Sequence, residues 1–219
     1  MTDNRQEFDR QLDAIEAKVI ELFAMVAEDL PKATEALLSN DGEVLAVLAE
    51  RERAIDALYP EIEDLASKEI LLQAPVATDL RYLLTVLRVV PEIERSHDLV
   101  MQIASMGGHD LGDELSPRAQ RLVQRMGDLA AGMWRTAADA WYQRDRAAVD
   151  GLRGRDEEMD ELRASLIGEL ASGRMPLPVT MEMTLACHFC KRLGAHAVNI
   201  CRRVIYLAGT SAPPELGQQ

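Results

Sequence analysis

Residues 36–58, ALLSNDGEVLAVLAERERAIDAL, align with residues 140–162, AWYQRDRAAVDGLRGRDEEMDEL, at a constant offset of 104. Within this stretch Ile55-Asp56-x-Leu58 matches Met159-Asp160-x-Leu162. Two unrelated amphipathic helices would also align weakly. The shared order of turns and the shared acidic position favour an internal repeat, in which each copy is about 100 residues long.

Each copy contains three stretches of helical periodicity. The first begins with apolar residues three and four apart, which is the stripe of an amphipathic helix: Phe8, Leu12, Ile15, Val19, Leu22, Met25, Val26. Turn residues at 39–42 end it, with Pro31 a predicted kink. Further helices are predicted over 41–72, 76–106, 116–142, 145–170 and 177–207.

The fold class that follows is all-α, with two tandem three-helix bundles related by the repeat. Residues 1–110 are predicted to form the first bundle and residues 111–210 the second. Ser116 is the expected N-cap of the fourth helix and Pro117 its first residue. Residues 211–219, which contain Pro213 and Pro214, are expected to form a mobile tail.

Composition and net charge narrow the range of functions that the protein could have. The 219 residues carry 24 Lys and Arg against 37 Asp and Glu, a formal net charge of −13. Such an acidic surface repels phosphodiester backbones, so nucleic-acid binding is not expected. No apolar stretch approaches membrane-spanning length, so any membrane contact is expected to be peripheral and through partners. The polar opening residues and three clustered cysteines favour a cytoplasmic protein.

Two acidic pairs stand out in the first repeat. Glu52 and Asp56 are four residues apart on the second helix, and Glu94 and Asp98 are four apart on the third. If these helices fold back antiparallel about Pro75, both pairs lie at the same level of one hairpin. Four facing carboxylates repel one another unless they are protonated or bridged by cations. Oxygen-rich clusters suit hard or borderline metals, with His97 as a further ligand or an outer-shell donor.

The second repeat has the same geometry with different chemistry. Asp156 and Asp160 match Glu52 and Asp56, but the positions opposite them are Lys191 and Ala195. A lysine facing two aspartates predicts an internal ion pair, which supplies positive charge without a metal. We therefore expect cation binding at the first site and a degraded or empty second site.

Several of these stretches together resemble the PhoU family of phosphate-signalling proteins. The matching residues are 52–59 (ERAIDALY), 73–81 (QAPVATDLR), 93–98 (IERSHD), 156–162 (DEEMDEL) and 191–200 (KRLGAHAVNI). The resemblance runs from about residue 7 to 209. In the last stretch the family commonly has Glu and Asp where this chain has Lys191 and Ala195; Arg192, His196, Asn199 and Ile200 still match.

The resemblance implies a cytoplasmic negative regulator of phosphate-starvation signalling. Such a protein acts between the phosphate ABC transporter, at its ATPase subunit, and a sensor histidine kinase, and has no enzymatic activity of its own. The acidic motifs, including Asp156 and Asp160, would hold metal ions such as iron, manganese, zinc or magnesium. His97 and His196 would lie in the outer shell. A homodimer is expected of such a bundle.

Other interpretations remain open from the residues alone. A metal-dependent or metal-handling enzyme would lose turnover on Glu94→Gln, and a purely structural bundle would bind no metal at all. Cys187 and Cys190 form a C-x-x-C, but buried structural thiols are the better explanation because no second pair is present. Trp134 and Trp141 fall at core spacing. Arg192, Arg202 and Arg203 could meet an acidic partner, although a solvated face or an intramolecular ion pair explains them more simply.

Overall fold

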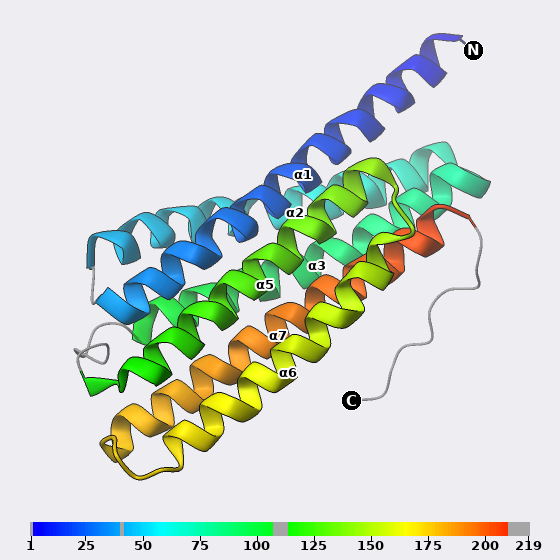
Figure 1. Cartoon of the computed structure of the whole chain (residues 1–219). Helices are drawn as coiled ribbons and strands as arrows, with labels where there is room; N and C mark the ends of the chain where they lie inside the picture. The colour runs from blue at the N-terminus through cyan, green and yellow to red at the C-terminus, as the bar shows by residue number, and fades with distance from the viewer. Residues whose placement is uncertain (1, 40–41, 107–113, 210–219) are drawn as a thin grey trace.

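The computed structural model describes residues 2–39, 42–106 and 114–209. All regular structure in these ranges is helical, and the helices lie side by side in one elongated bundle (Figure 1). In chain order they are α1 (Thr2–Ser39), α2 (Gly42–Gln73), α3 (Ala77–Met106), α5 (Pro117–Gln143), α6 (Ala148–Leu170) and α7 (Leu177–Leu207). The all-α prediction and the order of the helices are confirmed.

The helix boundaries agree with the predicted turns at most places. Ser116 caps α5, with its hydroxyl accepting a hydrogen bond from Ala119 N at 3.1 Å, and Pro117 follows it. The predicted start of α6 at residue 145 is wrong by three residues. Arg144 is left-handed, with φ 56°, and the Asp145 carboxylate accepts from Ala147 N at 2.8 Å. This local turn satisfies the backbone before the helix begins at Ala148.

Proline and positive φ angles shape the α2–α3 turn. Ala74 (φ 44°) and Ala77 (φ 50°) adopt the left-handed region on either side of Pro75, and the chain reverses there as predicted. Pro31, by contrast, lies inside α1, which continues through it. Each internal proline removes one backbone hydrogen bond, so the packing around such a helix must hold it together.

The helices pack as two bundles that share one core. The first bundle contains α1, α2 and α3, and the second contains α5, α6 and α7; the bundles meet where α1 packs on α5 and α3 packs on α7. Phe23 lies between Trp134 and Trp141, with ring centroids 6.1 and 5.9 Å apart. All three side chains are fully buried. This aromatic contact joins the repeats, so their apolar side chains form a single continuous cluster.

The α1–α5 contact is close enough to require a small residue. A Cβ at Gly127 would stand 2.3 Å from Oγ1 of Thr34, whose hydroxyl donates to Leu30 O at 3.0 Å. Glycine therefore permits the two helices to approach at this level. None of the described helices combines the length and the apolar character that a bilayer crossing requires. The expected mobile tail, residues 211–219, lies outside the described residues.

Candidate functional site

The second-repeat carboxylates lie on α6, against α7. Lys191 Nζ stands 2.8 Å from Asp156 Oδ1 and 2.9 Å from Asp160 Oδ2. Burial alone would lower the pKa of Lys191, but hydrogen bonds to both aspartates outweigh it and raise the pKa. The ammonium thus occupies the position between the two carboxylates, and Ala195 offers no oxygen ligand. The geometry is the ion pair that the alignment predicts.

Among the described residues, no lysine ammonium bonds to the two acidic pairs of the first repeat. Partial burial raises the pKa of Glu94, and the negative charges of Asp98 and Asp56 add to this effect, while Arg95 opposes it. Asp98 therefore acts on Glu94 along α3, and Asp56 acts on it across the α2–α3 hairpin. Glu52 lies one turn before Asp56 and is half-buried. Within the described ranges, no three His, Cys, Asp or Glu side chains converge as a ready ligand set.

The two histidines expected near the sites bond to other groups. His97 is buried on α3 and its Nε2 faces Asp29 Oδ2 at 3.3 Å. His196 on α7 has its Nδ1 2.7 Å from the hydroxyl of Ser96 on α3. Burial, together with the positive charges of Arg192 and Arg95, lowers the pKa of His196 to about 4. His196 is thus neutral at pH 7 and tied to the first repeat.

Asp29 is a buried charged residue that the sequence motifs do not mark. Its carboxylate is fully buried and faces His97, Lys32 Nζ at 3.1 Å and Arg51 Nη1 at 3.4 Å. A buried carboxylate needs such partners because desolvation otherwise disfavours its charged form. The signal in the sequence was an acidic residue between Val26 and Leu30 on the apolar stripe of α1.

Two further clusters join the repeats. Glu16 on α1 accepts from the Tyr82 hydroxyl at 2.9 Å, Trp141 Nε1 at 3.2 Å and Arg144 Nη2 at 3.0 Å. Burial and then the charge of Glu16 raise the pKa of Tyr82, so it stays a neutral donor. No sequence signal marks Glu16, since its partners come from two distant segments, α3 and the end of α5.

The second joining cluster centres on Glu92 of α3. The Asn199 side chain donates to Glu92 Oε1 at 3.2 Å, and Arg203 Nε lies 3.5 Å from Oε2. Burial raises the pKa of Glu92, whereas Asn199 and Arg203 counteract the shift. Both partners belong to α7, so this carboxylate fixes α3 against α7.

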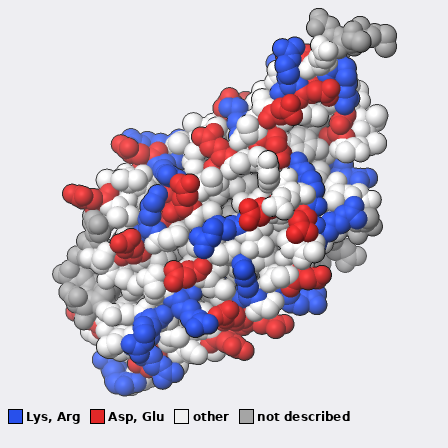
Figure 2. All heavy atoms as spheres, turned by 45° about the horizontal axis from the view of Figure 1, so that its top comes forward, with Lys and Arg blue, Asp and Glu red and all other residues white. Residues whose placement is uncertain are grey.

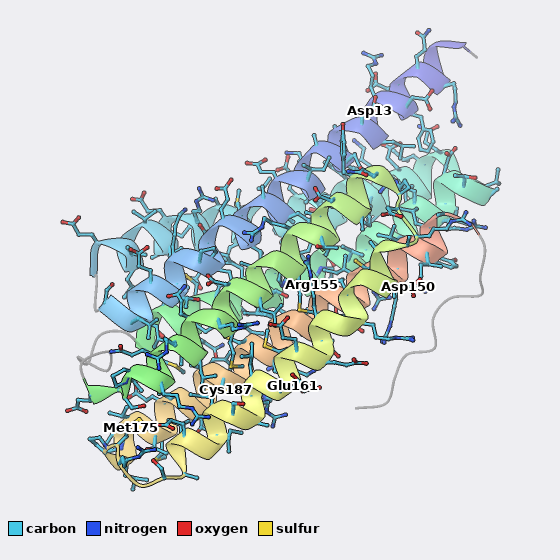
Figure 3. The ribbon with its side chains drawn as sticks, in the orientation of Figure 1. Asp13, Asp150, Arg155, Glu161, Met175 and Cys187 are labelled. Carbon is cyan, nitrogen blue, oxygen red and sulfur yellow. The ribbon has the colours of Figure 1, made fainter. Side chains whose placement is uncertain are left out.

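The cysteines and tryptophans have structural roles. Cys187, labelled on α7 in Figure 3, and Cys190 are free and buried, as is Cys201. Burial raises the pKa of Cys187 to about 11. Trp134 is fully buried and donates to Leu193 O at 3.0 Å. The interpretation of these residues as core is confirmed.

Charged side chains of both signs mix over the surface that Figure 2 shows. Many of them pair between neighbouring helices. Arg155 of α6, labelled in Figure 3, donates to Gly132 O and to the Thr136 hydroxyl of α5 at 3.0 and 2.8 Å. Arg125 pairs with Glu158 at 2.6 Å. Such exposed pairs add little stability each and do not mark a site.

The fold and the paired carboxylates define a class of tandem-repeat helical-bundle proteins. Within that class the family model described as PhoU domain matches residues 7–106 and 123–204, one segment in each repeat. The chain belongs to the PhoU family, as the sequence motifs indicate.

Individual relatives match along nearly the whole chain. The phosphate-specific transport system accessory protein PhoU homolog of Clostridium acetobutylicum is 24% identical over 93% of this chain and 94% of its own length. The phosphate-specific transport system accessory protein PhoU homolog 1 of Mycobacterium bovis is 27% identical over 96% of this chain and 97% of its own length. The crystal structure of PhoU from Pseudomonas aeruginosa has the same fold, with a TM-score of 0.84, 23% identity, and coverage of 92% and 98%.

The family membership also bears on the kind of activity. PhoU is a family of regulatory accessory proteins and not of enzymes, so the expectation of a non-enzyme is confirmed.

Proposed function

We propose that the protein is a cytoplasmic regulator of phosphate uptake and phosphate-starvation signalling. It acts as a helical adaptor between the phosphate ABC transporter, at its ATPase subunit, and a sensor histidine kinase, and it restrains the phosphate response when phosphate is plentiful. The observation that carries the proposal is the family match over both repeats, with relatives named as accessory proteins of the phosphate-specific transport system.

The adaptor is proposed to bind a divalent metal at the first repeat. Glu52, Asp56, Glu94 and Asp98 would hold it. Their all-oxygen chemistry suits magnesium, manganese or iron, with zinc also possible. The raised pKa of Glu94 supports this assignment because a nearby cation would relieve the repulsion that causes part of the shift.

The second site is proposed to be closed to metal. Lys191 neutralises Asp156 and Asp160 with direct contacts to each. His97 and His196 remain candidates for outer-shell roles, although their hydrogen bonds run to Asp29 and Ser96. A homodimer is proposed as the solution form, to be checked by sedimentation.

The adaptor role is tested by affinity capture from cells grown with and without phosphate, followed by mass spectrometry. Transporter and kinase components should be enriched in at least one state. Their absence from both captures would refute the adaptor role. Deletion of the gene should raise expression of phosphate-starvation genes in phosphate-rich medium.

The metal assignment is tested by elemental analysis of three purified proteins. Asp56→Asn should lose bound metal, whereas Asp156→Asn should retain the wild-type content. The two aspartates match in the repeat, so the substitutions form a matched pair. Loss of metal from Asp156→Asn alone would reverse the assignment.

A further inference from the structure

Arginines gather along the seam where α3 packs on α7. On α3, Arg81, Arg88 and Arg95 recur every seven residues, so they lie along one line of the helix. Three more come from α7. We call the set the arginine stripe, and its members are Arg81, Arg88, Arg95, Arg192, Arg202 and Arg203.

Contacts across the seam show that the two rows belong to one face. The Arg81 guanidinium lies 5.6 Å from the ring centroid of Tyr206 on α7. At the middle of the seam Glu92 meets Arg203, and further along Ser96 meets His196. The positive charges of Arg95 and Arg192 both act on His196, which places one arginine from each helix beside the same ring.

Most of the stripe forms no ion pair within the part of the chain that the structure describes. Arg88, Arg95 and Arg192 are exposed, and among the described residues none of them forms an ion pair with a carboxylate. Arg202 is also exposed and bonds only to the Asn199 amide oxygen, at 3.4 Å. A chain with 37 acidic residues therefore leaves four exposed guanidinium groups unpaired on one face.

Carboxylates border the stripe on both sides. Asp56 and Asp98 lie along its α2 side, and Asp156 and Asp160 lie along its α6 side, where Lys191 holds them. The positive charge of this seam is thus bordered by carboxylates of α2, α3 and α6. Broad anionic surfaces such as membranes or nucleic acids would meet the flanking carboxylates and the overall charge of −13.

We propose that the arginine stripe docks one acidic peptide segment of a partner protein. The inference rests on the proposed adaptor function and names the surface through which that function would act. Arg81 and Arg95 are roughly 21 Å apart along α3, at about 1.5 Å per residue. A segment of about four helical turns with acidic side chains along one face would match the row.

A fluorescein-labelled oligoglutamate of about 15 residues, long enough for this row, serves as the probe in fluorescence anisotropy. The stripe variant combines Arg88→Gln, Arg192→Gln and Arg202→Gln in the full chain. It should bind the probe about tenfold more weakly than wild type, since each exposed pair contributes a few-fold. The affinity of the wild-type protein should fall steeply as salt is raised.

The matched control makes the same charge change elsewhere, through Arg121→Gln, Arg135→Gln and Arg153→Gln on α5 and α6. These arginines are exposed as well. The control should bind the probe within about threefold of wild type, because the lost charges lie away from the seam. Circular dichroism confirms the fold of both variants, and replacing the three stripe arginines with lysine should preserve most of the binding.

Equal weakening by the stripe variant and the control would overturn the proposal, because the effect would then be one of net charge. Tighter binding to anionic phospholipid vesicles or to oligothymidylate than to oligoglutamate, through the same three arginines, would overturn the choice of an acidic peptide. If the stripe variant loses the probe but still captures the transporter and kinase components, the stripe is not the adaptor surface. If wild type binds the probe but captures neither component, the adaptor function fails instead.

Discussion

Lys191 is predicted to stabilise the second repeat without metal, and Lys191→Gln measures how much. The substitution removes two contacts of 2.8 and 2.9 Å between side chains that are 21%, 37% and 56% exposed. Ion pairs at such partly exposed positions contribute about 0.2–1 kcal/mol each. The aspartates left behind, four residues apart on α6, repel by about 0.2–0.5 kcal/mol.

The expected loss is therefore about 1–2 kcal/mol of unfolding free energy, which lowers Tm by roughly 2–8 °C for a chain of this size. The measurement is thermal unfolding at pH 7 with a chelator present. The pKa of Lys191 is raised from 10.5 in the folded state. Its contribution is thus complete below that pH and is lost as the pH rises through the folded-state pKa, where wild type and variant should converge.

Manganese supplies the second half of the test. Adding Mn²⁺ should restore part of the lost stability to Lys191→Gln, since a cation can then approach Asp156 and Asp160. Lys18→Gln is the control, because among the described residues Lys18 forms a single ion pair, with Glu61 at 3.0 Å, at a similar exposure of 27%. A Tm for Lys191→Gln that equals wild type, or a loss no larger than that of Lys18→Gln, would refute the reasoning.

Three further predictions concern packing, pH and thiol chemistry. Gly127→Ala should lower the free energy of unfolding in urea by about 1–3 kcal/mol, because the added Cβ would clash with Thr34. Gly154→Ala, which has open space around it, should be neutral or stabilising. Equal effects of the two substitutions would contradict this prediction. The pKa of His196 is lowered from 6.5 to about 4, so the wild-type protein should lose unfolding free energy as the pH falls from 6.5 to 4. His196→Gln should lose less over the same range. Parallel plots of stability against pH for the two proteins would be the contrary result. Burial and the pKa of about 11 at Cys187 should keep the thiols unreactive to a disulfide reagent at pH 8 until the chain unfolds. Rapid labelling of the native protein would count against this prediction.

The helices could be predicted from the sequence because each depends on local pattern. The apolar stripe of α1 and the Ser116-Pro117 start of α5 are signals carried by neighbouring residues. The reversal of the chain around Pro75 also followed, because a short turn between two long helices forces an antiparallel arrangement. The start of α6 did not, since the Asp145 turn competes locally with the helix.

The polar contacts between repeats could not be predicted in the same way. Glu16 meets Tyr82, Trp141 and Arg144, whose positions in the sequence carry no common spacing. The partners become neighbours only when α1, α3 and α5 pack together. His97 shows the same limit: its place beside Glu94 in the sequence gave no sign that its ring also bonds to Asp29 of α1.

The repeat also shows that the two copies have diverged in matched pairs. Asp29 and His97 in the first copy align with Met133 and Gly194 in the second, at offsets of 104 and 97. There, Met133 Sδ stands 3.2 Å from where a Cβ of Gly194 would be, so the thioether packs closely against this glycine. Replacing both members of a buried polar pair with apolar groups is close to neutral, whereas replacing one leaves an unpaired buried charge.

The surface carboxylates also differ between the two copies together with the residues that face them. Lys191 and Ala195 stand opposite Asp156 and Asp160 in the second copy, and the ammonium of Lys191 pairs with both aspartates. The aspartates of the second copy are therefore paired with a positive charge of the protein itself. In the first copy, the charges of Asp56 and Asp98 still repel that of Glu94. A divalent cation can lower the free energy of the first copy more than that of the second. Any metal dependence of the adaptor should consequently act from the α2–α3 hairpin, beside Arg95 of the arginine stripe.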